Sequence, residues 1–75
     1  MTEIARRLIN VLARAPLRWC DDCLARELQL PRRQQAQAIT GVLEEMPRYE
    51  RGIAACDFCK EPSKMVIEWK GNAAA

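Results

Sequence analysis

Two Cys-x-x-Cys motifs constrain the fold of this 75-residue chain more than any other feature. The first is Cys20-Asp-Asp-Cys23, and the second is Cys56-Asp-Phe-Cys59. A Cys-x-x-Cys turn lets two sulfur atoms point at one ion, and Zn²⁺ prefers four such ligands in a tetrahedron. The sequence therefore predicts one structural zinc site, held by Cys20, Cys23, Cys56 and Cys59, which joins the two motifs across the middle of the chain.

Cysteines in this pattern have other uses. Free thiols in a small core and thiols that sense oxidants are alternatives that the spacing leaves open. A catalytic zinc is disfavoured, because four protein thiolates leave no position for a water molecule. Disulfides are disfavoured because the N-terminal residues lack the apolar core and cleavage site of a signal peptide, so we expect a cytoplasmic protein with reduced thiols.

The length of the chain predicts a single domain with a thin core, which needs a metal or another staple. We expect a zinc-stapled domain over residues 1–70 and a flexible tail over 71–75. No apolar run approaches the roughly 18 residues of a membrane span, so we expect no membrane partner. The chain has no histidine, no glycine-rich phosphate loop and a single serine, Ser63. We therefore expect neither an enzyme nor a small-molecule substrate.

Apolar periodicity predicts three helices. The first covers residues 3–14, with Thr2 as its N-cap, and the proline at position 16 ends it. The second opens at Asp21 and Asp22, whose charges suit a helix N-terminus, and Leu30-Pro31 breaks it. The third runs from about residue 32 to 46. The residues expected on its buried face are Ala36, Ile39, Leu43 and Met46.

Strand patterns occupy the remaining segments. Residues 17–19 form a short strand between the first two helices. From residue 48 the period changes to two, which predicts strands near 49–53 and 65–69. Turn residues and the second Cys-x-x-Cys motif separate these strands. We therefore expect this segment to form a hairpin, with the second Cys-x-x-Cys motif near its tip.

The segment from Leu24 to Ile39, LARELQLPRRQQAQAI, resembles the helix-turn-helix of winged-helix domains. Two departures from the family pattern are Gln29, where glycine is common, and the first apolar anchor at Ala36, one residue late. The resemblance implies an α+β fold with three helices, a short strand and a C-terminal hairpin wing. It also implies that the first strand pairs antiparallel with the last, which brings Cys20 to the hairpin tip.

The resemblance implies that the third helix enters the major groove of double-stranded DNA. Arginine and glutamine can fork onto base edges there, and cations on a wing can touch phosphate or the minor groove. The candidate DNA contacts are Arg32, Arg33, Gln34, Gln37 and Thr40 on the helix, and Arg48, Arg51, Lys60 and Lys64 around the hairpin. The alternatives are an ordinary solvated helix face and an edge hairpin kept soluble by charge.

The expected function is a DNA-binding domain, used as a small transcriptional regulator and open to homodimer formation through its first helix. The rival is a protein–protein adaptor, including a phage-type protein that covers a surface of a host protein. The formal net charge is +2. Four zinc-bound thiolates and one divalent ion would bring that charge near zero, which favours the adaptor.

Overall fold

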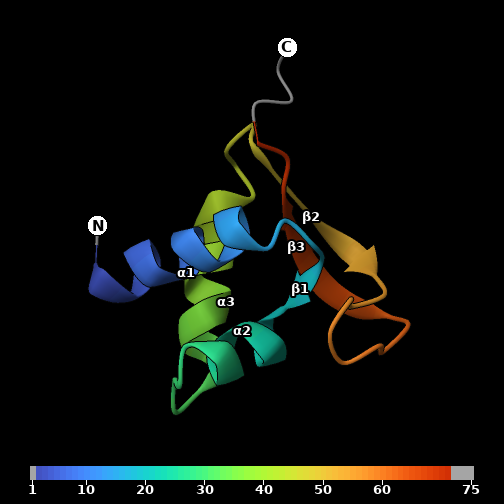
Figure 1. Ribbon diagram of the computed structural model, residues 1–75, viewed down its shortest axis with the longest axis horizontal. Coiled ribbons are helices and arrows are strands. Elements are labelled where there is room, and N and C mark those ends of the chain that lie inside the picture. Colours follow the sequence, from blue (N-terminus) through green and yellow to red (C-terminus); the bar gives the residue numbers. More distant parts are fainter. Residues whose placement is uncertain (1, 72–75) are drawn as a thin grey trace.

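Three helices lie together beside a three-stranded antiparallel sheet (Figure 1). The computed structural model describes residues 2–71, so most of the predicted tail lies outside the described residues. The elements follow the order α1 (Glu3–Arg14), β1 (Trp19–Cys20), α2 (Asp21–Glu27), α3 (Arg33–Leu43), β2 (Tyr49–Ala54) and β3 (Lys64–Trp69). The predicted α+β class and element order are confirmed. None of the helices in residues 2–71 has the length and apolar character that crossing a membrane requires.

Helix α1 begins and ends where its sequence predicts. The hydroxyl of Thr2 accepts a hydrogen bond from the backbone N–H of Ala5 at 3.1 Å, which satisfies one free donor of the first turn. The helix stops before Pro16, because a proline disfavours helical geometry in the residue that precedes it. Its buried stripe consists of Leu8, Val11 and Leu12.

Helix α2 ends in a turn that depends on Gln29. The N–H of Leu30 donates to the carbonyl of Ala25 at 2.8 Å, and the N–H of Gln29 donates to Arg26 at 3.1 Å. This pair of bonds is a Schellman motif, whose central residue adopts a left-handed conformation. Gln29 has a φ of 57°, although glycine is the usual residue at such a position.

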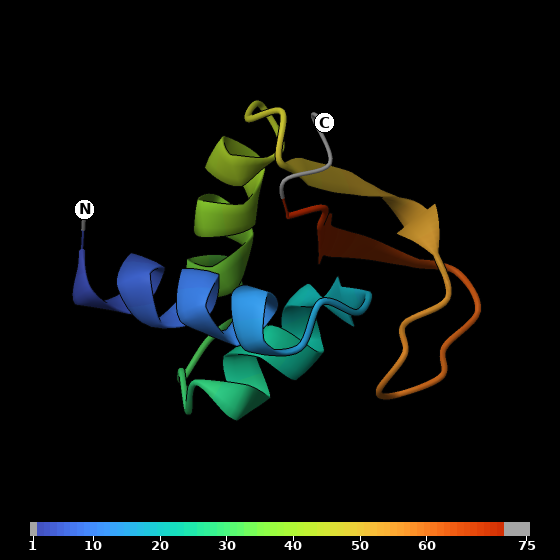
Figure 2. The ribbon, with the colours of Figure 1, turned by 45° about the horizontal axis from the view of Figure 1, so that its top comes forward.

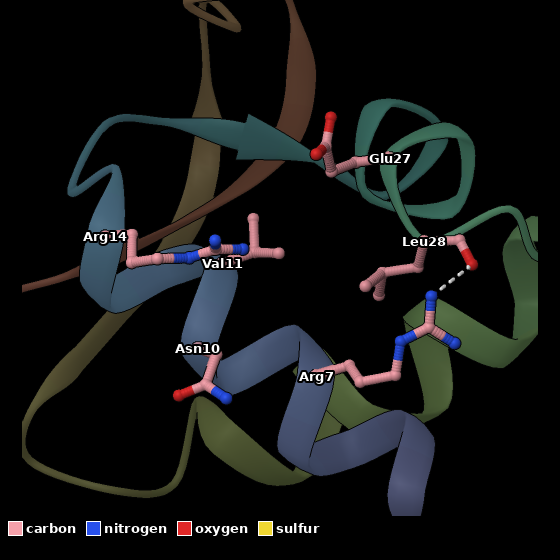
Figure 3. Close-up of a pocket in the computed structure, with 6 residues that line it drawn as sticks. All are labelled: Arg7, Asn10, Val11, Arg14, Glu27 and Leu28. Atoms are coloured by element: carbon pink, nitrogen blue, oxygen red, sulfur yellow. Dashed lines mark hydrogen bonds between the residues drawn. The ribbon is translucent and has the colours of Figure 1, made fainter.

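Helix α1 also contacts this turn. The guanidinium of Arg7 donates to the carbonyl of Leu28 at 3.1 Å (Figure 3). A cation suits the C-terminal end of a helix, where backbone carbonyls lack partners. Arg7, Arg14 and Glu27 line a hollow between the two helices, and the bond from Arg7 fixes α1 against the end of α2.

Helix α3 is shorter than predicted. It ends at Leu43, whereas the sequence indicated a helix to residue 46, and Met46 is 42% exposed instead of buried. The N–H groups of Glu45 and Met46 bond three residues back, to Val42 and Leu43, which tightens the chain into turns. Pro47 favours this ending, because a proline disfavours helical geometry in the residue before it.

The strand order is β1-β3-β2 (Figure 2). Strand β1 pairs antiparallel with β3, with Trp19 opposite Ile67 and Cys20 opposite Val66. This confirms the predicted pairing of the first and last strands, although β1 begins at Trp19 and not at residue 17. The pairing places Cys20 beside the beginning of β3, at the end of the hairpin that carries the second motif.

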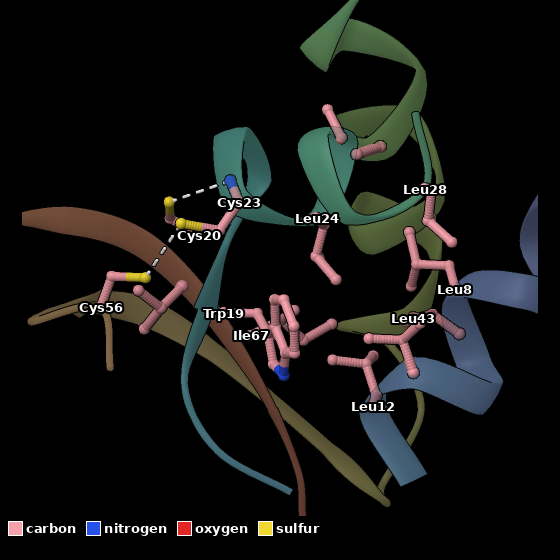
Figure 4. Close-up of a cluster of buried hydrophobic side chains, with 14 residues drawn as sticks. Leu8, Leu12, Trp19, Cys20, Cys23, Leu24, Leu28, Leu43, Cys56 and Ile67 are labelled. Carbon is pink, nitrogen blue, oxygen red and sulfur yellow. Dashed lines mark hydrogen bonds between the residues drawn. The ribbon is translucent and has the colours of Figure 1, made fainter. Parts of the chain in front are cut away.

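The core lies between the helices and the sheet (Figure 4). Leu8, Leu12, Leu24 and Ile67 are completely or almost completely buried. Each such side chain contributes about 1.5–3 kcal/mol through removal of apolar surface from water. Trp19 is also buried, and its indole N–H donates to the carbonyl of Ala15 at 3.0 Å. The core therefore joins β1 to α1 as well as to β3.

Candidate metal centre

The sulfur atoms of the four cysteines lie within 4.8 Å of one another. The Sγ atoms of Cys20 and Cys59 are 3.8 Å apart, and those of Cys23 and Cys56 are 3.7 Å apart. Four sulfurs bound tetrahedrally at about 2.3 Å from a zinc ion lie about 3.8 Å from each other. The predicted convergence of the two motifs is confirmed, and its spacing suits a four-thiolate metal site.

Three of the cysteines are buried, and Cys59 is exposed. Buried sulfur ligands keep water away from an ion, while an exposed one leaves a route for the ion to enter. Cys20, Cys23 and Cys56 also belong to the apolar core. The cluster is therefore continuous with the core and opens to solvent at Cys59.

The first motif forms the start of α2. Cys20 is both the last residue of β1 and the N-cap of α2, and its sulfur accepts the backbone N–H of Cys23 at 3.4 Å (Figure 4). The two residues between the cysteines, Asp21 and Asp22, occupy the first helical turn. Their negative charges suit the positive end of the helix dipole.

The second motif lies in the loop between β2 and β3. The N–H of Lys60 donates to the carbonyl of Cys56 at 3.0 Å, and Lys60 takes a φ of 66° that closes the turn. Asp57 holds this loop against β1. Its carboxylate accepts the N–H of Arg18 at 2.7 Å, and its own N–H donates to the Arg18 carbonyl at 3.0 Å. The two hydrogen bonds between Asp57 and Arg18 therefore hold the second motif close to the first, in addition to the contacts among the sulfur atoms.

The pKa values of Cys20, Cys23 and Cys56 are shifted, and not all in the same direction. Burial raises the pKa of Cys20 and of Cys23 above the ordinary value. Burial also opposes ionisation of Cys56, but backbone N–H groups of Cys59 and Phe58 donate toward its sulfur and lower its pKa to about 6. Since metal ligands must be deprotonated, Cys56 is better prepared than Cys20 or Cys23 to bind a cation.

Two basic side chains lie beside the cluster. Arg26 and Lys64 line a cavity together with Cys23 and Cys59, and the acidic residues Asp22 and Glu61 line it too. Four thiolates around one divalent ion would carry a net charge of −2, which nearby cations stabilise. The spacing of the sulfurs fits a four-thiolate metal site, while the two basic and two acidic residues of this cavity balance each other.

The aspartates inside the first motif connect it to the rest of the molecule. Asp21 accepts the hydroxyl of Thr40 at 3.0 Å and the guanidinium of Arg51 at 3.4 Å. Asp22 accepts Lys64 Nζ at 2.8 Å and lies 3.7 Å from the guanidinium of Arg33. The sequence suggested only capping roles for these aspartates. Two consecutive acidic residues inside a Cys-x-x-Cys turn were the only hint of these contacts in the sequence. Their partners lie 11–42 positions away in the sequence, so local patterns could not identify them.

Three of the nine candidate DNA contacts lie together. Arg33, Gln37 and Lys64 line one pocket between α3 and the hairpin, and Asp22 pairs with both Arg33 and Lys64. Arg32 and Gln34 are exposed at the N-cap and in the first turn of α3. Lys60 is exposed in the turn that follows the second motif.

The other three candidates lie elsewhere. Thr40 is buried, so its predicted place on the exposed face of the helix is wrong. Residue 40 faces α2, so its hydroxyl donates a hydrogen bond to Asp21. The side chain of Arg51 is only 10% exposed and is held by Asp21 and Glu44. Arg48 precedes β2 at the end of the hairpin where Tyr49 pairs with Trp69, away from Lys64.

The cysteine cluster, the two aspartates and their cationic partners form one connected set of contacts among α2, α3 and the hairpin. Such a set can hold a metal ion and fix the orientation of the elements around it. Comparison of the chain with models of known protein families, with curated protein sequences and with solved structures found no match.

Proposed function

We propose that this chain is a winged-helix domain, held by a structural zinc ion, that binds double-stranded DNA as a small transcriptional regulator. The observation that supports it best is the placement of the exposed, polar start of α3 beside the hairpin tip, at the cysteine cluster. In a winged helix, α3 is the reading helix and the β2–β3 hairpin is the wing. The order of elements and the pairing of β1 with β3 are those expected of that fold.

Zinc is the proposed metal because four thiolates in a tetrahedron are a ligand set it favours. Cys20, Cys23, Cys56 and Cys59 would hold it. The ion would supply no reaction chemistry, because its four positions are filled by protein. It would instead join the N-terminus of α2 to the hairpin. Asp21, through Thr40, and Asp22, through Arg33, would connect this joint to α3.

The first turns of α3 are the proposed reading surface. Arg33 and Gln37 line a pocket between α3 and the hairpin together with Lys64, and Arg32 and Gln34 are exposed beside them. Arginine and glutamine suit guanine and adenine edges, while lysine suits phosphate. Glu44 and Glu45 follow α3 and would repel phosphate. Only the N-terminal half of the helix is therefore proposed to dock.

The cations at this end limit how strongly binding can depend on salt. Four of them are exposed or half-exposed, namely Arg32, Arg33, Lys60 and Lys64. Each phosphate contact contributes a slope of about −0.9 in log affinity against log salt concentration. Four contacts therefore predict a slope no steeper than about −4 for one copy of the chain.

A salt titration tests the DNA proposal. Fluorescence anisotropy of a labelled mixed-sequence duplex would be measured with zinc-loaded protein at increasing salt. We expect binding in dilute salt and a log-linear loss of affinity as salt rises, because bound counterions are released from the DNA. Absence of duplex binding in dilute salt by folded, zinc-loaded protein would overturn the proposal.

A protein–protein adaptor is the second candidate, and a specific feature of the hairpin favours it. Ile53 of β2 pairs with Met65 of β3, and these side chains are 66% and 41% exposed. An exposed apolar pair beside charged residues is typical of contact sites for proteins. In this role the domain would cover a surface of another protein, and the salt titration would find no duplex binding.

A further inference from the structure

Cys59 differs from the other three cysteines in its access to solvent. It is exposed, whereas Cys20, Cys23 and Cys56 are buried. A cavity of about 330 Å³ opens beside Cys59, and its two acidic and two basic lining residues leave it with no net formal charge. Exposure is one of the properties that make a cysteine sulfur susceptible to oxidation. A small uncharged oxidant such as hydrogen peroxide can therefore reach one sulfur of the cluster directly from solvent.

The sulfur of Cys59 contacts a sulfur of the other motif. Its Sγ atom lies 3.8 Å from that of Cys20, and the second short contact, 3.7 Å from Cys23 to Cys56, also runs between the motifs. A disulfide bond is about 2.05 Å long, so the sulfurs of Cys20 and Cys59 need to approach by only about 1.8 Å to form one. The spacing of the motifs in the sequence does not say which sulfurs would pair, whereas these contacts favour a bond between the motifs.

Two contacts that involve no sulfur hold the second motif against β1. The carboxylate of Asp57 accepts the backbone N–H of Arg18 at 2.7 Å. The ring of Phe58 packs on that of Trp19, with the ring centroids 3.7 Å apart. The residue that follows each aromatic ring in the sequence is one of the two cysteines in the 3.8 Å contact. These two sulfurs therefore stay neighbours when they are not held by a metal.

We infer that Cys59 is the entry point of a redox switch, in which a peroxide joins it to Cys20 by a disulfide bond and the metal is released. Metal ligands must be thiolates, and this bond leaves only those of Cys23 and Cys56, which is half of the site. The motifs stay joined, by the ion in the reduced chain and by a covalent bond in the oxidised one. The switch rests on the proposed zinc site but not on DNA binding.

Two displacement steps form the bond. The thiolate of Cys59 attacks one oxygen of hydrogen peroxide, the O–O bond breaks, hydroxide leaves, and Cys59 becomes a sulfenic acid. The thiolate of Cys20 then attacks this sulfur, the S–O bond breaks, and a second hydroxide leaves. The two sulfurs together lose two electrons, which the peroxide gains. A dithiol reductant returns two electrons by thiol–disulfide exchange and restores both ligands.

The oxidised chain should keep its fold without zinc. A bond between positions 20 and 59 encloses about 40 residues, and a cross-link over a long loop restricts the unfolded chain more than one over a short loop. A bond inside either motif would enclose only that motif and leave the hairpin free. We therefore expect circular dichroism to show more helix in the oxidised, zinc-free chain than in the reduced chain stripped of zinc by a chelator.

Peroxide treatment of the full, zinc-loaded chain tests the switch. A chromogenic chelator would follow zinc release, and the remaining thiols would be alkylated before digestion with trypsin. Cleavage after arginine and lysine places the two motifs in separate peptides, 19–26 and 52–60. We expect mass spectrometry to find these peptides joined, fragmentation to place the bond between Cys20 and Cys59, and zinc to be released in step with the bond.

A variant of Asp57 tests how the pair is placed. Asp57→Ala removes the acceptor for the Arg18 N–H, so the ratio of joined to separate peptides should fall about two- to tenfold, the loss expected of one hydrogen bond. Glu61→Ala is the matched control. Glu61 is an exposed acid beside Cys59, and its side chain forms no hydrogen bond or ion pair within the described part of the chain. Its loss should leave the ratio unchanged, and zinc content and circular dichroism would verify the fold of both variants.

Two results would overturn the switch. One is a pair of separate peptides, each with a disulfide inside its own motif, and the other is zinc that stays bound while peroxide is consumed. Zinc content measured before oxidation tests the metal site separately. A chain that contains no zinc and still forms the bond between Cys20 and Cys59 would overturn the proposed zinc site while supporting the pairing of these sulfurs.

Discussion

Lys64, the first residue of β3, donates a hydrogen bond of 2.8 Å to Asp22, which lies between the two cysteines of the first motif. The same carboxylate lies 3.7 Å from the guanidinium of Arg33 at the start of α3. One side chain inside a cysteine motif therefore links the hairpin to α3. The orientation of these two elements depends on the place where the four sulfurs meet.

This link predicts a shifted ionisation of Asp22. The hydrogen bond from Lys64 holds the pKa of Asp22 below its ordinary value of 3.8, although burial opposes the shift. Because the folded pKa is lowered, the stabilisation is fully present above the ordinary value and is lost as pH falls through the lowered one. Lys64→Met should raise the pKa of Asp22, as followed by the carboxyl ¹³C shift. An unchanged titration would show that the pair does not form in solution.

The left-handed residue after α2 predicts a stabilising substitution. Gln29 has a φ of 57°, a conformation that glycine adopts without a steric penalty. Gln29→Gly should raise the free energy of unfolding by about 0.5–1 kcal/mol, as measured by urea denaturation of zinc-loaded protein.

A second glycine substitution provides the control. Gln34 is exposed inside α3, and Gln34→Gly should lower the free energy of unfolding by up to about 1 kcal/mol. Equal effects of the two substitutions would mean that the turn at Gln29 does not have the left-handed geometry.

Substitution of Thr40 tests whether this residue belongs to the core or contacts DNA. Its hydroxyl is buried and donates to Asp21 at 3.0 Å. Thr40→Val keeps the volume but removes the donor, so the free energy of unfolding should fall by about 1–3 kcal/mol. Duplex affinity of the folded variant, measured by anisotropy, should stay unchanged. A fall in duplex affinity with an unchanged free energy of unfolding would show that Thr40 contacts DNA and has no role in the core.

Two arginines at opposite ends of the hairpin and α3 test where DNA docks. Arg33→Ala should cost about 1–3 kcal/mol of duplex binding if its guanidinium forks onto a base. Arg48→Ala removes the same charge at the far end of the hairpin, and salt screens charges beyond about 10 Å. The second substitution should therefore change duplex affinity little. Equal losses in both variants would indicate nonspecific attraction and exclude the proposed reading surface.

Much of this fold could be predicted from the sequence because its signals are local. Thr2 and Pro16 mark the ends of α1, and alternation of apolar residues marks the hairpin. The resemblance to winged-helix domains implied the pairing of the first strand with the last, but the register of Cys20 with Val66 could not be read from the sequence. The convergence of the cysteines needed only their spacing and the preference of a tetrahedral ion for four similar ligands.

The errors arose where long-range contacts decide the outcome. A period of 3.6 residues placed Thr40 on the polar face of α3, but Asp21 of α2 supplies a buried acceptor that makes the inward position favourable. The sequence predicted Arg51 to be an exposed cation of the wing, but its guanidinium forms ion pairs with Asp21 and Glu44. The exposure of Met46 followed from the early end of α3, which propensity and pattern do not fix to the residue.

The central claim is that one zinc ion joins the two cysteine motifs, and X-ray absorption spectroscopy at the zinc edge of the purified chain tests it most directly. One zinc per chain is expected, surrounded by four sulfur atoms at about 2.3 Å. In the Cys56→Ser variant, one of these sulfurs should be lost from the zinc ion, or the ion should be released. A chain that folds fully without metal, or a zinc ion bound mainly by nitrogen and oxygen, would show that no four-sulfur zinc site holds the two motifs together.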